Sequence, residues 1–258
     1  MVDLKGKVCV VTGAAKSIGF AIAQRYARQG ALVALLDINP EVTKSAEGLA
    51  AEGLTARGYV TDITSREAVQ ECFADITKAL GPVYCLVNNA GVVDQRPFED
   101  VTPEVLDLMF KVNVYGTVYC CQEALKTMKT LGDGRIVNFS SKSGKTGSAL
   151  MAPYSAAKGS IIALTHSLAF EYAQNNIKVN CLCPGITDAT GVWSSVSEGY
   201  TKNLNLSRDE VIKKFTAKIP LGRLTDIEDL VEFVQFLTVS GDYCTGQAFN
   251  VTGGREMH

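Results

Sequence analysis

The first forty residues constrain the fold most strongly, because they predict a strand, a glycine-containing turn, a helix and a second strand. Residues 7–12 form an apolar run typical of a short buried strand, and a helical pattern extends from the turn to Gly30. Residues 31–36 form the second apolar run, which ends at Asp37. A strand–helix–strand unit of this kind places its two strands in parallel in one sheet.

The turn of this unit has the features of a phosphate-binding loop. Gly13 allows a tight turn, and Gly19 lets the helix approach the strand or a pyrophosphate closely. Asp37 is placed to accept hydrogen bonds from an adenosine ribose and to repel a 2′-phosphate, which favours NAD over NADP. Lys16 instead favours NADP, because a loop lysine can pair with the 2′-phosphate. The alternative for this unit is a doubly wound domain that binds a different nucleotide.

The rest of the chain continues the alternation of strands and helices. Strands are predicted at residues 55–60, 83–87, 135–139, 177–183 and 247–251, and helices at residues 41–52, 65–80, 102–130, 153–174 and 225–239. This order predicts a doubly wound α/β fold, in which one mostly parallel sheet has helices on both faces. We expect one domain over residues 1–258, with the cofactor half at about 1–140 and the catalytic and substrate elements at about 141–258. Residues 186–218 follow the carboxyl end of a strand and are irregular, which predicts a lid over the substrate.

Composition excludes several classes of function. The net charge is −2 and no run of five like charges occurs, which argues against nucleic acid or an anionic membrane as partner. No apolar stretch reaches eighteen residues, and charges at the very start interrupt any signal-peptide core, so we expect a cytoplasmic protein without a membrane span. Among the eight cysteines, Cys181 and Cys183 lie in an apolar run that favours buried thiols over a metal site or disulfide, and no metal is predicted.

Three residues in the middle of the chain indicate acid–base chemistry. Ser141 follows an apolar run, Tyr154 comes thirteen residues later, and Lys158 comes four after that, one helical turn from the tyrosine. A neighbouring ammonium favours a phenolate. Lowering a tyrosine pKa by about three units takes roughly 4 kcal/mol of differential interaction. A lysine and a cationic cofactor together could supply that free energy. Ser141 is placed to hold the same substrate oxygen. This arrangement predicts proton transfer at a hydroxyl or carbonyl oxygen, with the hydride going elsewhere.

Other polar residues stand at strand ends or in an unusual helical position. Asp62 is expected at the adenine end of a cofactor, or else as a helix cap. Asn88 and Asn89 are expected to bond backbone and cofactor, or else to form a plain turn. Asn113 interrupts a long helical pattern, and either a functional role or a local backbone bond explains it.

These motifs together resemble the short-chain dehydrogenases/reductases over the whole chain. The matching residues are Thr12, Gly13, Gly19, Asp37, Asp62, Asn88, Asn89, Ala90, Gly91, Asn113, Ser141, Tyr154, Lys158, Pro184 and Gly185. The resemblance implies a Rossmann-type sheet of seven strands, hydride transfer with a nicotinamide cofactor, and a homotetramer or dimer. One residue departs from the pattern: Ser17 stands where the family usually has glycine, and it either crowds the pyrophosphate or donates a hydrogen bond to it.

The resemblance also implies individual roles. Asn113, Ser141, Tyr154 and Lys158 form the catalytic set, in which Tyr154 is the acid/base, Lys158 lowers its pKa and bonds the nicotinamide ribose, and Asn113 holds a water. Thr187 or Thr190 contacts the carboxamide or the phosphates. The implied cofactor-binding residues are Gly13, Ser17, Ile18, Gly19, Asp37, Asp62, Ile63, Asn89, Ala90, Gly91, Tyr154, Lys158, Pro184, Gly185 and Thr187.

A finer likeness concerns the substrate. Residues 141–148 and 243–254 resemble the sorbitol-6-phosphate 2-dehydrogenase branch of the polyol dehydrogenases, which implies oxidation of a sugar alcohol or its phosphate with NAD. The expected substrate contacts are Ser141, Lys142, Ser143, Lys145, Tyr154 and Trp193. Lys142 and Lys145 would neutralise a substrate phosphate, or else are solvated loop lysines, and Trp193 contacts substrate or packs within the lid. The alternatives are a reductase of 3-oxoacyl thioesters or small diketones, and a nucleotide-binding protein without catalysis.

Overall fold

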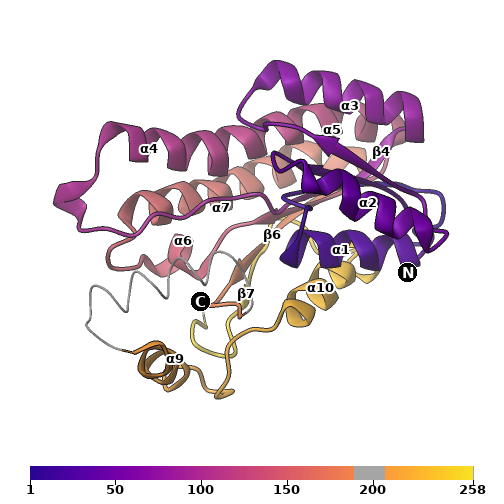
Figure 1. Ribbon diagram of the computed structural model, residues 1–258. Helices are drawn as coiled ribbons and strands as arrows, with labels where there is room; N and C mark the ends of the chain where they lie inside the picture. The colour runs from indigo at the N-terminus through magenta and orange to yellow at the C-terminus, as the bar shows by residue number, and fades with distance from the viewer. Residues whose placement is uncertain (189–206, 258) are drawn as a thin grey trace.

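One seven-stranded sheet forms the centre of the molecule (Figure 1). The computed structural model describes residues 1–188 and 207–257. The strands lie in the order β3-β2-β1-β4-β5-β6-β7, and every neighbouring pair is parallel. The strands are β1 (Val8–Thr12), β2 (Leu32–Asp37), β3 (Ala56–Val60), β4 (Val83–Asn88), β5 (Gly134–Phe139), β6 (Ile177–Pro184) and β7 (Ala248–Val251). The predicted doubly wound α/β fold is confirmed, and the sheet is wholly parallel.

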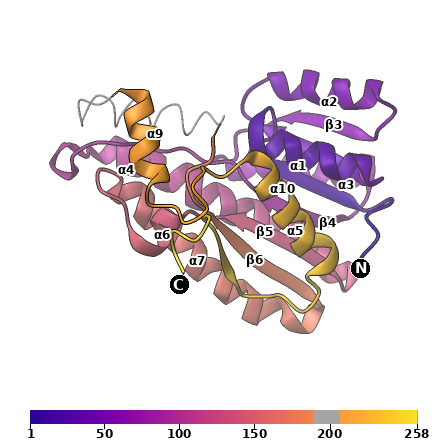
Figure 2. The same ribbon diagram turned by 90° about the horizontal axis from the view of Figure 1, so that it is seen from below.

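Helices cover both faces of the sheet (Figure 2). The α-helices are α1 (Ser17–Arg28), α2 (Glu41–Ala51), α3 (Arg66–Leu80), α4 (Pro103–Phe110), α5 (Thr117–Leu131), α6 (Lys142–Thr146), α7 (Ala152–Tyr172), α9 (Arg208–Thr216) and α10 (Ile227–Gln235). Short 3-10 helices are η1 (Phe98–Asp100) and η3 (Ala173–Asn175), and π-helices are η2 (Lys111–Gly116) and η4 (Phe236–Ser240).

The strands are buried on both faces, and this explains their near-continuous apolar sequences. In β1, Cys9 and Val11 pack with α1, α2 and α10, whereas Val8 and Val10 pack with α3 and α5 on the other face. The period of two along the strand thus assigns alternate residues to two separate cores. Each core anchors its own layer of helices.

The strand order reverses between β1 and β4, and this reversal positions the site. From β1 the chain proceeds outward through β2 to β3, and it then returns to form β4 on the other side of β1. In open α/β sheets a crevice forms at the carboxyl ends of strands where the order reverses. The loops after Thr12 and Asn88 therefore meet at this edge.

Two segments differ from the sequence-based prediction. The single helix predicted for residues 102–130 is three segments, α4, η2 and α5, because a π-helical turn interrupts the regular α-helix around Asn113. The short helix α6 was not predicted; the hydroxyl of Ser141 caps it by accepting a hydrogen bond from the Ser143 amide at 3.1 Å. Gly144 brings α6 against α7, since a Cβ there would lie 2.7 Å from the Lys158 carbonyl carbon.

Candidate active site

The loop after β1 is bound tightly to the loop after β4. The Asn89 side-chain amide donates to the carbonyl oxygens of Thr12 and Gly13, both at 3.1 Å, and the Thr12 hydroxyl accepts from the Asn89 and Ala90 amides at 3.1 Å. A Cβ on Gly13 would lie 2.8 Å from the Ala90 Cα. The two loops therefore form one rigid wall of the crevice.

Ser17 begins α1 in a left-handed conformation. Its φ is 57°, a value that glycine adopts freely and that strains a residue with a Cβ. This backbone conformation is one that favours glycine over a residue with a Cβ. The Ser17 hydroxyl is buried and has no hydrogen-bond partner in the structure. An unpaired hydroxyl at the N-terminus of a helix fits the phosphates of a bound nicotinamide nucleotide.

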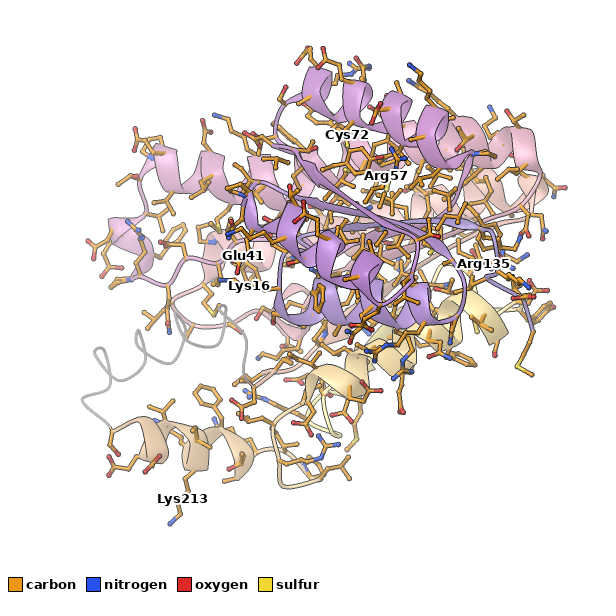
Figure 3. The ribbon with its side chains drawn as sticks, turned by 45° about the vertical axis from the view of Figure 1, so that its right-hand side comes forward. Lys16, Glu41, Arg57, Cys72, Arg135 and Lys213 are labelled. Atoms are coloured by element: carbon orange, nitrogen blue, oxygen red, sulfur yellow. The ribbon has the colours of Figure 1, made fainter. Side chains whose placement is uncertain are left out.

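Asp37 ends β2 with its carboxylate held toward the same loop. One oxygen accepts from the Ala15 amide at 3.0 Å, and the other accepts from the Asn39 amide at 2.9 Å. The loop is tied to α2 through the Ser45 hydroxyl, which donates to the Ala15 carbonyl at 2.7 Å. Lys16 is exposed (Figure 3). Two backbone amides thus hold a negative charge where β2 ends.

The remaining residues expected at the adenine end form local contacts. Asp62 is exposed and accepts hydrogen bonds from the amide and hydroxyl of Thr64, while Ser65 caps α3. Asp62 is therefore not the helix cap considered as the alternative. Ile63 is buried against Gly116, where a Cβ would lie 2.6 Å from its side chain.

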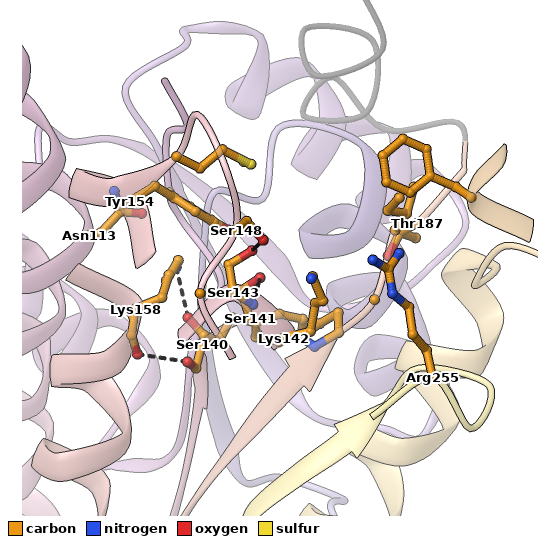
Figure 4. Close-up of a pocket in the computed structure, with 18 of the residues that line it drawn as sticks. Asn113, Ser140, Ser141, Lys142, Ser143, Ser148, Tyr154, Lys158, Thr187 and Arg255 are labelled. Carbon is orange, nitrogen blue, oxygen red and sulfur yellow. Dashed lines mark hydrogen bonds between the residues drawn. The ribbon is translucent and has the colours of Figure 1, made fainter. Parts of the chain in front are cut away.

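A cavity of about 530 Å³ lies at the carboxyl edge of the sheet (Figure 4). Its lining includes twelve of the predicted site residues, namely Ile18, Asn89, Gly91, Asn113, Ser141, Lys142, Ser143, Tyr154, Lys158, Pro184, Gly185 and Thr187. Predicted residues that do not line it are Gly13, Ser17, Gly19, Asp37, Asp62, Ile63, Ala90 and Lys145. Trp193 and Thr190, and with them much of the predicted lid, lie outside the described residues.

Tyr154 and Ser141 both line this cavity. Burial raises the pKa of Tyr154 above its ordinary value, and a hydrogen bond with the Ser141 side chain opposes that rise. The expectation that Lys158, together with a bound cationic cofactor, lowers the pKa of this phenol stays a prediction.

Lys158 is held beside Tyr154 by its own backbone contacts. Its ammonium lies 5.8 Å from the centre of the Tyr154 ring and donates to the Phe139 carbonyl at 2.8 Å. The Ser140 hydroxyl donates to the Lys158 carbonyl at 2.7 Å (Figure 4). Burial lowers the pKa of Lys158 to about 8. The end of β5 therefore fixes both ends of this residue.

Asn113 lies next to Lys158 because of the π-helical turn. Its side-chain amide donates to the carbonyls of Val92 and Met109 at 2.9 and 3.0 Å, so the local backbone bond considered from the sequence is present. A Cβ on Gly91 would lie 2.8 Å from the Asn113 side-chain oxygen and 3.3 Å from the Lys158 ammonium. Both groups thus approach one point, which only glycine leaves open.

The two lysines that bracket Ser141 have different surroundings. Lys142 lines the cavity and lies 3.7 Å from the Glu256 carboxylate. The Lys145 ammonium instead donates to the Ala248 carbonyl on β7 at 2.6 Å and does not line the cavity. The structure therefore does not bring Lys145 to the cavity with the other expected substrate contacts, because the helical turn of α6 points it toward β7.

Three basic residues of the cavity wall are not among the contacts that the sequence predicts. Arg255 comes from the segment after β7, whereas Lys214 and Lys218 come from α9 and the residues after it. A capping box formed by Ser207 and Glu210 begins α9. No sequence spacing links these residues to Ser141, so only the fold reveals their proximity.

The cysteines are free thiols, and most of them are buried. All eight cysteines are free thiols, and Cys181 and Cys183 are buried in β6. Burial raises the pKa of Cys121 to about 12 and that of Cys72 to about 11. Within residues 1–188 and 207–257, no cluster of three metal-ligating side chains occurs. Among these same residues, no helix is both long and apolar enough to cross a membrane.

Comparison with known proteins identifies the family. A family model described as short chain dehydrogenase matches residues 7–201. Sorbitol dehydrogenase of Cereibacter sphaeroides is 37% identical over 257 residues, covering 98% of this chain and 99% of that protein. The structure of NAD⁺-bound xylitol dehydrogenase has a TM-score of 0.93 at 33% identity, covering 98% of this chain and 100% of the other. The structure of sorbitol-6-phosphate 2-dehydrogenase from Erwinia amylovora has a TM-score of 0.93 at 32% identity, covering 97% of this chain and 100% of the other.

This chain belongs to the short-chain dehydrogenase/reductase family. It is an oxidoreductase with a nucleotide-binding fold of the NAD(P) type, and polyol dehydrogenases are among its relatives. Another relative binds the other cofactor: the structure of an actinorhodin polyketide ketoreductase with NADPH has a TM-score of 0.93 at 32% identity, covering 98% of each chain.

Proposed function

We propose that the protein interconverts a secondary alcohol and a ketone on a sugar alcohol or a sugar-alcohol phosphate, with NAD as cofactor. The observation that carries the reaction is the convergence of Asn113, Ser141, Tyr154 and Lys158 on one cavity. The polyol substrate is supported by the sorbitol and xylitol dehydrogenases among the relatives. Residues 1–140 supply most of the cofactor contacts in this proposal, and residues 141–258 supply the substrate contacts.

The proton transfer follows from the positions of the side chains. A bound nicotinamide nucleotide would supply the hydride acceptor for oxidation and the hydride donor for reduction. Ser141 holds the substrate oxygen by a hydrogen bond, and Tyr154 takes the hydroxyl proton during oxidation or returns it during reduction. Lys158 favours the phenolate and bonds the nicotinamide ribose, and Asn113 positions a water that connects Lys158 to solvent.

The two directions should differ in their pH dependence, because Tyr154 accepts a proton in one direction and gives it back in the other. Oxidation needs the deprotonated phenol, so its rate rises with pH until Tyr154 has titrated. Reduction needs the protonated phenol, so its rate falls over the same range. A pH profile measured in both directions tests this assignment, and parallel profiles contradict it.

Asp37 supports NAD rather than NADP in this proposal. Its carboxylate is fixed by two backbone amides, so a 2′-phosphate would meet a negative charge that cannot move away. Asp37→Asn removes the charge and keeps an acceptor for one of the two amides. We expect the ratio of kcat/KM for NAD over NADP to fall at least about tenfold, the equivalent of about 1.4 kcal/mol. An unchanged ratio would argue against Asp37 as the selector.

The substrate class is tested by NAD reduction with purified protein on sorbitol, other hexitols and pentitols, and their phosphates. Turnover of polyols or their phosphates supports the proposal. The second candidate is reduction of 3-oxoacyl thioesters or small diketones, which a putative ketoacyl reductase of Streptomyces coelicolor, 34% identical over 262 residues, favours. Turnover of those compounds alone would replace the first proposal with the second. A homotetramer in the cytoplasm stays a prediction, and sedimentation measures the assembly.

A further inference from the structure

The charges on the cavity wall are unbalanced at one end. Within the described part of the chain, five basic residues line the cavity and no aspartate or glutamate does. Lys158 donates to the Phe139 carbonyl and belongs to the proposed proton-transfer residues. The other four basic residues have no part in the proposed proton transfer. These are Lys142, Lys214, Lys218 and Arg255. In the view of Figure 4, Lys142 and Arg255 lie beyond Ser141, on the side away from Lys158.

Lys142 and Arg255 share one carboxylate. Glu256 lies 3.7 Å from the Lys142 ammonium and 3.2 Å from the Arg255 Nε, through the same oxygen. The side chains of Lys142 and Arg255 are only 14% and 16% exposed, and that of Glu256 is 8% exposed. Two largely buried cations with one shared anion leave an excess positive charge that water compensates poorly.

The hydrogen-bonding capacity of Arg255 is also incompletely used. Its Nε faces Glu256, and its guanidinium carbon lies 5.5 Å from the centre of the Phe215 ring. Its Nη1 is buried without a hydrogen-bond partner. Guanidinium groups bind tetrahedral oxyanions through two parallel N–H groups, and a buried donor without a partner is rare in a folded protein.

The titration of Lys142 agrees with this geometry. Burial lowers its pKa, and the charge of Arg255 lowers it further, while Glu256 acts in the opposite direction. The repulsion between Lys142 and Arg255 therefore adds to the effect of burial on Lys142. A second anion at this point would relieve it.

We propose that Arg255 and Lys142, with Lys218 at the rim, bind a terminal tetrahedral oxyanion of the substrate. This inference rests on the proposed function and deepens it: the substrate is a sugar alcohol that carries a phosphate. Tyr154 and Ser141 hold the reacting oxygen, and the phosphate occupies the basic end of the same cavity. Lys145, which the sequence suggested for this role, has no part in it.

The test measures binding rather than turnover. Isothermal titration of the NADH complex with sorbitol 6-phosphate and with sorbitol gives the preference for the phosphate. We expect the phosphate to bind about 10- to 100-fold more tightly, as charge-assisted hydrogen bonds predict. Arg255→Met removes the guanidinium while keeping an apolar contact for Phe215, and we expect it to abolish most of this preference.

Two further variants keep the test independent of folding. Lys218 is exposed, so Lys218→Met preserves the fold, and we expect it to reduce the preference about two- to fivefold. Lys213→Met is the matched control, because Lys213 is an exposed lysine five residues before Lys218, does not line the cavity, and extends into solvent in Figure 3. It should leave the preference unchanged. Equal affinity for both ligands, or a preference that neither Arg255→Met nor Lys218→Met alters, would overturn the proposal.

The outcomes also separate this proposal from the proposed function. If sorbitol 6-phosphate binds through Arg255 but reduces no NAD, the oxyanion site stands and the polyol reaction fails. If free and phosphorylated polyols are oxidised equally well in every variant, the reaction stands and the oxyanion site fails. A third ligand, 3-hydroxybutane-1-sulfonate, distinguishes the source of the anion: tighter binding than the phosphate, with the same dependence on Arg255, would assign the site to sulfonates.

Discussion

Replacing Ser17 tests the strained loop and the cofactor site in one experiment. The residue has a φ of 57° and a buried hydroxyl without a partner. Ser17→Ala keeps the strain and removes the hydroxyl, which should raise the free energy of unfolding of the free protein by about 1 kcal/mol. Ser17→Gly also removes about 1–2 kcal/mol of strain. The greater freedom of glycine in the unfolded chain lowers the free energy of unfolding by about 0.4–1 kcal/mol and so offsets part of this gain.

The glycine variant should therefore be more stable than the alanine variant by about 0.8 kcal/mol. For a chain of this size that difference corresponds to a rise in Tm of roughly 2–3 °C. Affinity for NAD should fall in both variants, although both are expected to be more stable. A hydroxyl that donates to the pyrophosphate contributes about 1.5–3 kcal/mol, so both variants should raise the Kd at least about tenfold.

Thermal denaturation of the free protein and isothermal titration with NAD measure the two effects separately. A glycine variant no more stable than the alanine variant would refute the strain argument. Wild-type affinity in both variants would show that the hydroxyl does not contact the cofactor. Weaker binding in the glycine variant alone would assign the loss to backbone flexibility.

Three further predictions concern the cavity. Tyr154→Phe should lower kcat at least about 100-fold while NAD still binds, and unchanged turnover would remove Tyr154 as the acid/base. Because Lys158 has a folded pKa of about 8 against an ordinary 10.5, the unfolded chain binds more protons between these values. Wild-type stability relative to Lys158→Met should therefore rise as the pH increases through this range, and urea titrations at several pH values measure it. Gly91→Ala should reduce turnover with little loss of secondary structure by circular dichroism, since its Cβ would lie 2.8 Å from the Asn113 oxygen; full activity would contradict that crowding.

The sequence predicted the strands and helices well because they depend on local pattern. Each strand is buried on both faces, so an apolar run bounded by polar residues marks it regardless of its neighbours. The spacing of Tyr154 and Lys158 likewise depends only on helical geometry, and both residues line the cavity as expected. The interruption around Asn113 is different. Its π-helical turn depends on side-chain bonds to Val92, in a distant loop, that no helical pattern encodes.

The charge near Ser141 shows the limit of reasoning from neighbouring residues. Lys142 and Lys145 are both close to Ser141 in sequence, but α6 turns one toward the cavity and the other toward β7. Arg255 is more than one hundred residues away and still reaches the same cavity. The side chain that best fits an anion was therefore absent from the prediction, whereas a lysine that binds a carbonyl was included.

The two groups of cavity residues differ in what holds them, and this has a consequence for specificity. Lys158 and Asn113 are fixed by hydrogen bonds to the main chain of β5 and of the loop after β4, which form the rigid centre of the sheet. Arg255 is held by Glu256 and by Phe215 of α9, which are themselves peripheral. Replacing residues of the first group must disturb the reaction itself, whereas the second group can change without altering the sheet. Differences in substrate among relatives with this fold should therefore concentrate in α9 and the segment after β7.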